Sequence, residues 1–142
     1  MTFHKSIALS VLALATACAP AGPTMTTSAT FQGGDRPISA VSAARLFQSV
    51  CVANRNNLSA IPAALAQSTF ILNTSENVYY HVDYDLSFAL VASSPNPICS
   101  FVWASPEPVS VNQAALASVA PGGQFRDVRE ISKFNYSIRG LP

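Results

Sequence analysis

The side chains best suited to acid–base chemistry are His81 and Asp83, which lie two positions apart in the alternating run Val78–Leu90 (VYYHVDYDLSFAL). On an extended strand, residues i and i+2 share a face, so the carboxylate could orient the imidazole. A hydrolase would also need a nucleophile, and no serine here has the G-x-S-x-G context of a nucleophile elbow. We therefore interpret both residues as part of a solvated polar strand face, with a small hydrolase that uses His81 as an alternative function.

The sequence predicts neither a metal site nor a cofactor site. Glu76, Asp83 and Asp85 lack the spacing and the glycine of a calcium-binding loop. A zinc site would have to combine one histidine with cysteines far apart in the chain, which is a poor match to known ligand spacings. No catalysis is evident from these residues, and we expect the protein not to be an enzyme.

The first seventeen residues have the features of a secretory signal peptide. His4 and Lys5 give a basic start, and the uncharged, almost wholly apolar run 6–17 follows. This run is shorter than the ~20 residues of a membrane-spanning helix but fits the apolar region of a signal peptide. Ala15 and Ala17 then supply small residues directly before Cys18. Residues 1–17 are therefore predicted to be removed on export.

The segment Leu14-Ala15-Thr16-Ala17-Cys18 resembles the lipobox of bacterial lipoproteins, although Ala15 stands where that family most often has leucine. The resemblance implies cleavage before Cys18 and a thioether-linked diacylglycerol on its thiol, with palmitate among the acyl chains that Cys18 carries. Two or three acyl chains are enough for stable membrane anchoring. The alternative is ordinary cleavage after Ala17, which would leave Cys18 with a free thiol.

Lipidation of Cys18 would leave two of the three cysteines, Cys51 and Cys99, as a natural disulfide pair. Exported proteins reach compartments in which disulfides persist. In the loop-entropy model, a bridge that closes a loop of this length stabilises a protein by roughly 4 kcal/mol. The alternative is two separate buried thiols.

The composition without the leader is electrically balanced. Loss of Lys5 reduces the eight Lys and Arg residues to seven, which equal the seven Asp and Glu residues. A nucleic-acid-binding protein needs a basic face, so we expect no nucleic-acid partner. Prolines and glycines between residues 18 and 37 predict a lipid-anchored flexible tether, and residues 38–142 are expected to form a single domain.

Periodicity in residues 38–142 predicts an α+β fold. Ser39 is a plausible N-cap for a helix that reaches Cys51, Ser59 for a second short helix, and Ser110 or Asn112 for a third. Strands are expected at 69–72, at 78–90 as one strand or a hairpin, at 98–104, and in a hairpin within 125–138. The prediction is a small antiparallel sheet of four to five strands packed with two to three short helices and one disulfide. Val78, Tyr80 and the alternate residues up to Leu90 are expected to face the core.

A helix written F-x-x-x-C (Phe47–Cys51) followed by a strand written C-S-F (Cys99–Phe101) resembles a loose class of small uncharacterised secreted proteins of Gram-negative bacteria. That class has no agreed activity. Together the resemblances imply a lipid-anchored, periplasm-facing envelope protein with a structural or binding role, at the outer membrane in preference to the inner. Its expected partners are the membrane, through the lipid, and an envelope protein. A periplasmic inhibitor or immunity protein is a second alternative.

Overall fold

Seven strands form one mixed sheet in the computed structural model, which describes residues 22, 24–93 and 95–141. The strand order is β1-β2-β3-β4-β5-β7-β6, and every neighbouring pair is antiparallel except β1 and β2. The strands are β1 (Thr27–Ser28), β2 (Phe70–Asn73), β3 (Val78–His81), β4 (Leu86–Val91), β5 (Ile98–Trp103), β6 (Gln124–Val128) and β7 (Lys133–Arg139).

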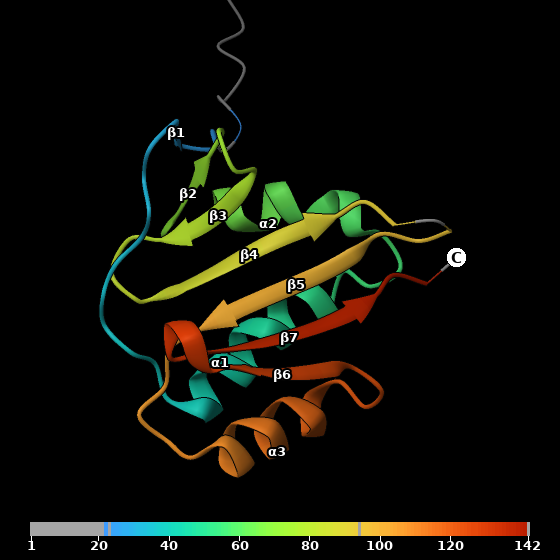
Figure 1. The fold of residues 1–142 in the computed structure, drawn as a ribbon. Helices are drawn as coiled ribbons and strands as arrows, with labels where there is room; N and C mark the ends of the chain where they lie inside the picture. The colour runs from blue at the N-terminus through green and yellow to red at the C-terminus, as the bar shows by residue number, and fades with distance from the viewer. Residues whose placement is uncertain (1–21, 23, 94, 142) are drawn as a thin grey trace, which may run out of the picture.

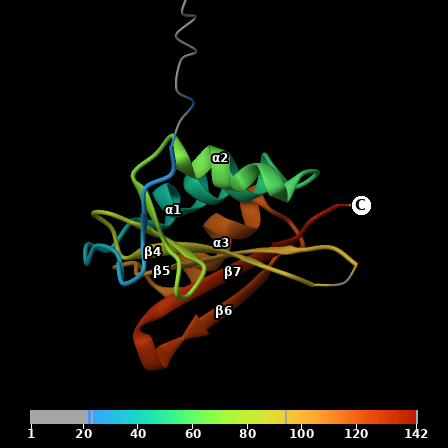
Figure 2. The same cartoon turned by 90° about the horizontal axis from the view of Figure 1, so that it is seen from above.

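Three α-helices cover one face of this sheet, as Figures 1 and 2 show from two directions. They are α1 (Ala40–Phe47), α2 (Ile61–Ala66) and α3 (Val109–Val119). A π-helical turn, Gln48–Val52, extends α1, and 3-10 turns lie at Leu58–Ala60 and Arg129–Ile131. The opposite face of the sheet carries no helix among the described residues.

The α+β class is confirmed, but the predicted sheet of four to five strands was too small. One reason is that β1 lies within the segment expected to be a tether. The second is that the run 78–90 divides into β3 and β4, because bends at Val82, Asp83 and Asp85 turn the chain back on itself. The hairpin alternative for this run is thus the correct one, and β6 and β7 form the expected C-terminal hairpin.

Helix α1 begins where the sequence predicts. The Ser39 hydroxyl accepts a hydrogen bond from the Ser42 amide at 3.2 Å, so Ser39 is the N-cap. The Glu107 carboxylate accepts a further bond from the Ala40 amide at 2.6 Å, which satisfies an amide that has no partner within the helix. Helix α3, by contrast, is preceded by Pro108 at its N-cap, and Ser110 and Asn112 lie inside it.

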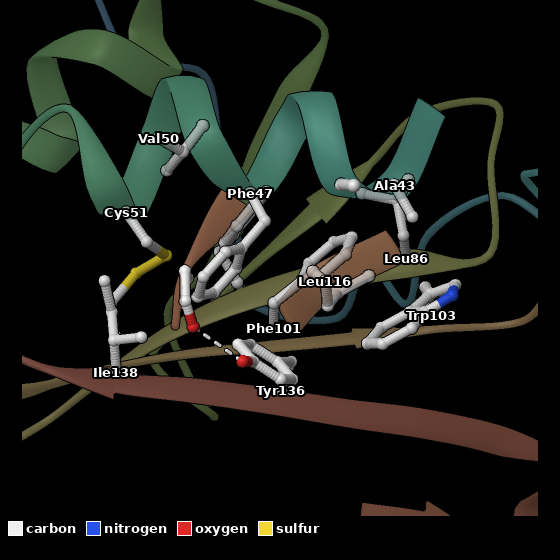
Figure 3. Close-up of a cluster of buried hydrophobic side chains, with 14 of the residues drawn as sticks. Ala43, Phe47, Val50, Cys51, Leu86, Phe101, Trp103, Leu116, Tyr136 and Ile138 are labelled. Carbon is white, nitrogen blue, oxygen red and sulfur yellow. Dashed lines mark hydrogen bonds between the residues drawn. A yellow bond between two sulfur atoms is a disulfide. The ribbon is translucent and has the colours of Figure 1, made fainter. Parts of the chain in front are cut away.

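Aromatic rings fill the layer between helices and sheet. The rings of Phe88, Phe101 and Trp103 stack with centroids 4.6 and 4.9 Å apart. Phe47 descends from α1 onto them and meets Tyr136 edge-on at 5.2 Å (Figure 3). All five side chains are at most 2% exposed, and burial on this scale provides the main stabilisation of the fold.

The segment predicted as a flexible tether is ordered along the sheet over its second half. Thr27 and Ser28 pair with β2, the Gly34 amide donates to the His81 carbonyl at 2.9 Å, and Arg36 forms a bridge with Tyr84. A Cβ atom at Gly34 would overlap the backbone of Asp83, so only glycine fits this contact. This segment is ordered because unpaired backbone N–H and C=O groups of the neighbouring strands form hydrogen bonds with it. The composition of the segment alone did not reveal these partners.

Candidate functional site

His81 is buried, at 8% exposure, and does not lie on a solvated strand face as predicted. The register of β3 with β4 places Tyr79 opposite Phe88, so Tyr79 and His81 face the core, whereas Val78 and Tyr80 face away from it. The alternating pattern correctly predicts a strand but assigns its two faces the wrong way round. The bends after His81 restore the predicted assignment in β4, where Leu86 and Phe88 are buried.

The hydrogen bonds of His81 define its protonation state. Its Nδ1 atom accepts from the Asp83 amide at 3.0 Å and from the Tyr84 amide at 3.2 Å, so Nδ1 carries no proton. The proton of the neutral ring is therefore on Nε2, which lies 2.7 Å from the Thr69 hydroxyl oxygen and donates to it. A general base would need a lone pair on Nε2, so this arrangement cannot activate Thr69 as a nucleophile.

The Asp83 carboxylate does not orient the imidazole as expected, because the contact comes from the Asp83 backbone amide. The carboxylate instead lies 3.8 Å from the Arg36 guanidinium, with both side chains more than half exposed. Such a pair contributes little to stability. The Arg36 guanidinium also lies over the Tyr84 ring at 4.6 Å. This geometry makes His81 a structural side chain that holds the bend between β3 and β4.

The stability of the protein should depend on pH through His81. Burial lowers the pKa of the imidazole, as does the Arg36 charge, against an opposing contribution from Asp83. The unfolded chain therefore binds a proton more readily than the folded protein below about pH 6.5, so stability falls as the pH decreases through that value. Thermal unfolding from pH 7.5 to 5 should show a decreasing Tm. In His81→Gln, which does not titrate, the slope should be flatter, and an unchanged slope would contradict the assignment.

None of the described serines in β4, β5 and the connection between them forms a hydrogen bond with the His81 side chain. Ser87 and Ser100 are on the other face of the sheet, and the Ser93 hydroxyl accepts a hydrogen bond from Arg139 at 3.1 Å. Ser94 is outside the described residues. Within residues 22, 24–93 and 95–141, no group of three His, Cys, Asp or Glu side chains could hold a metal ion.

The predicted disulfide is present between Cys51 and Cys99, whose Cα atoms are 5.8 Å apart. Cys51 lies in the π-helical turn that follows α1, and Cys99 lies in β5, so the bridge joins helix to sheet (Figure 3). Both residues are fully buried. Cys18, the proposed lipidation site, lies outside the described residues. In the described part of the chain, no helix is long and apolar enough to cross a membrane.

The sheet face opposite the helices carries no helix among the described residues, and we call it the open face. Residues 31–33 lie over its β2–β3 part, because the Phe31 carbonyl accepts a hydrogen bond from the buried Asn73 side chain and Gly33 approaches the Tyr80 side chain. The side chains of the open face come from the alternate positions of β2 to β5 and β7, and nearly all are half-buried. These residues are Ile71, Asn73, Val78, Tyr80, Ser87, Ala89, Val91, Ile98, Ser100, Val102, Lys133, Asn135, Ser137 and Arg139. The centre of the open face therefore has small side chains, both apolar and polar, and no charged side chain, and the Asn135 amide donates to the Ser100 hydroxyl there at 2.8 Å.

Opposite corners of the open face differ in charge. On the β2–β3 side, the Tyr80 hydroxyl donates to the Glu76 carboxylate at 2.7 Å. Burial and the neighbouring Glu76 carboxylate raise the pKa of Tyr80 to about 12, so its hydroxyl remains protonated and Glu76 is held in place. On the β6–β7 side, Arg139 borders a small hollow of about 140 Å³. The hollow is lined by Ile98, Gly122, Gln124, Ser137, Ile138 and Arg139.

Sequence reasoning missed the open face because it assigned the wrong residues of 78–81 to the core. The available signal was the alternation of small and polar residues with aromatic ones in β5 and β7, where Ser100 and Ser137 alternate with buried rings. Comparisons with protein-family models, with curated proteins and with solved structures find no match to this chain.

Proposed function

We propose that this protein is a lipid-anchored component of a bacterial cell envelope that acts by binding, with the open face of its sheet as the binding surface. Cys18 is the anchor, the folded domain faces the periplasm, and the outer membrane is preferred over the inner. Catalysis has no part in this proposal.

The observation that carries the binding role is the open face itself. The helices cover only one side of the sheet, and the β4–β5 part of the other side has small, uncharged side chains such as Ala89, Ser100 and Val102. Monomeric proteins more often cover a solvent-facing sheet with charged side chains, and an exposed apolar face indicates a contact surface. The hydrolase alternative would require His81 as its catalytic residue. The two backbone amides that donate to its Nδ1 atom instead support a structural role for His81.

The anchor rests on the sequence from Leu14 to Cys18 and on cysteine parity. With Cys51 and Cys99 bonded to each other, Cys18 has no cysteine partner within its own chain. A lipid thioether at Cys18 would account for the third cysteine.

Replacement of Cys18 by serine should release the protein from the membrane. A serine cannot accept the thioether-linked lipid, so the variant should move from the membrane fraction to the soluble fraction. The intact mass of the wild-type protein should correspond to a chain that begins at Cys18, plus the acyl groups, minus two hydrogens for the disulfide. A Cys51→Ser/Cys99→Ser variant is the matched control and should remain in the membrane fraction. An unmodified Cys18, or an intact leader on the exported protein, would disprove the anchor.

A further inference from the structure

We propose that protonation of His81 releases residues 32–37 from the bend between β3 and β4 while the rest of the domain stays folded. We call these residues the crossing segment, because they run past that bend on the way from β1 to α1 (Figure 1). Their release would uncover the β2–β3 part of the open face. That consequence rests on the binding role proposed above, whereas the release itself does not.

Among the described residues, the crossing segment forms hydrogen bonds only with the bend and with His81, the last residue of β3. The Gly34 amide donates to the His81 carbonyl at 2.9 Å, and the Arg36 amide donates to the Asp83 carbonyl at 3.4 Å. The Arg36 carbonyl accepts from the Asp85 amide at 2.7 Å. The attachment of the segment therefore depends on the shape of the bend.

The residues on either side of the crossing segment have partners of their own. The Phe31 carbonyl accepts from the Asn73 side chain at 3.0 Å, and the Ile38 amide donates to the Ala104 carbonyl at 2.9 Å. No side chain of the crossing segment is buried. The segment can therefore leave the bend without exposing the core or separating the main strands, which is the condition for a local opening.

The bend keeps its shape through the neutral imidazole of His81. The amides of Asp83 and Tyr84 both donate to its Nδ1 atom, at 3.0 and 3.2 Å, and have no other acceptor among the described residues. A proton on Nδ1 would face two N–H groups, so the imidazolium loses both bonds and the ring or the bend has to move. Either movement displaces the Asp83 carbonyl and the bridge between Arg36 and Tyr84 that hold the crossing segment.

The charges around the ring couple the proton to the release. The ring packs between Phe70 and Tyr84, with ring centroids at 5.1 and 5.0 Å. Burial is the main cause of the lowered pKa of His81, the Asp83 carboxylate opposes it and the Arg36 guanidinium adds to it. Release takes Arg36 away from the ring and loosens its enclosure. The released state therefore binds a proton more tightly than the attached state, and acid favours release.

Release would change the open face at Tyr80. A Cβ atom on Gly33 would lie only 3.0 Å from the Tyr80 ring, so the crossing segment lies directly against this side chain. Without the segment, this side of the Tyr80 ring is open to solvent or to a partner. Acid would therefore enlarge the part of the open face that is available for binding.

The test is hydrogen–deuterium exchange of the full chain in detergent, measured by mass spectrometry between about pH 7.5 and about pH 5.5 and corrected for the intrinsic pH dependence of exchange. The opening equilibrium of residues 32–37 and 82–85 should increase by up to about tenfold for each pH unit below about 6.5. Strand β5 should keep its protection over the same range, because the release is local.

Two variants separate the imidazole from the other groups of the bend. His81→Gln does not titrate and keeps a side-chain oxygen that can accept from the bend, so protection of the crossing segment should no longer change with pH. Asp83→Asn is the matched control, because it removes the carboxylate but keeps the backbone amide that contacts the ring. Its pH dependence should remain. If His81→Gln does not fold, ¹⁵N NMR of the wild-type imidazole should show Nδ1 gaining a proton at the same pH midpoint as the segment loses protection.

Three results would overturn the proposal. They are protection of the crossing segment that does not change with pH, a pH dependence that persists in His81→Gln, and a loss of protection in β5 together with the segment. Failure of the binding role is distinguishable from these results. A partner that binds elsewhere on the domain would contradict the role of the open face and would leave the measured release unchanged.

Discussion

Replacement of Cys51 and Cys99 together by serine lowers the free energy of unfolding by about 4 kcal/mol, which is the largest single effect expected for this protein. The bridge spans a sequence separation of 48 residues, and the unfolded chain without it gains the conformations of that open loop. Domains of this size are stabilised by roughly 5–15 kcal/mol in total, so the variant should be close to unfolding at physiological temperature. Denaturant titration of the oxidised protein and of the variant measures the difference.

The position of the bridge adds a local consequence. Cys51 ties the turn after α1 to β5, the strand next to β4 and β7 in the sheet. A change below about 1 kcal/mol would contradict the loop-entropy account. A parallel control, Ser49→Ala, removes only an exposed hydroxyl that bonds within its own helix to the Leu46 carbonyl. Its free energy of unfolding should stay within about 0.5 kcal/mol of the wild type.

Replacement of Asn112 by leucine should destabilise the protein by about 3 kcal/mol, because it leaves buried polar groups without partners. The Asn112 carbonyl accepts from the Trp103 indole N–H at 3.0 Å, and its amide donates to the carbonyls of Glu107 and Pro108 at 2.9 and 3.1 Å. Asn112 and Trp103 are both completely buried, so water cannot replace these bonds. Chemical denaturation gives the free energy directly.

A double-mutant cycle isolates the indole bond from the rest of this cost. In a Trp103→Phe background the indole N–H is absent, so Asn112→Leu should cost less than in the wild-type protein. Gln113→Leu provides the matched control on α3, because Gln113 is exposed and makes none of these bonds. Equal costs of Asn112→Leu in both backgrounds would show that the indole contact does not contribute.

Local signals in the sequence were enough to predict the helices and the disulfide. The Ser39 hydroxyl and the apolar spacing up to Cys51 define α1 through contacts within a few residues. The pairing of Cys51 with Cys99 followed from the assignment of Cys18 to lipid, which left two cysteines. The helix prediction rests on contacts between residues close in the sequence, and the disulfide prediction rests on the number of cysteines. Neither depends on how distant parts of the chain pack together.

The wrong predictions concern residues whose burial or order depends on pairing between strands that are far apart in the sequence. Which face of β3 is buried depends on its register with β4, and a shift of one residue exchanges the faces. His81 was assigned to solvent because its burial depends on amides from the following bend and on the Thr69 hydroxyl. The order of residues 24–37 depends likewise on strand partners more than forty residues away, such as Leu72 for Thr27.

The pairing of Thr27 with β2 also limits the distance between the folded domain and a lipid attached to Cys18. Nine peptide units separate Cys18 from Thr27. Because a chain spans at most about 3.3–3.6 Å per residue, Thr27 can lie at most roughly 30 Å from Cys18. With its lipid in a bilayer, the domain would therefore remain near the headgroups with the β1 edge closest to its anchor. Neighbouring molecules would move in two dimensions with restricted height, and such confinement raises the effective concentration at which they meet.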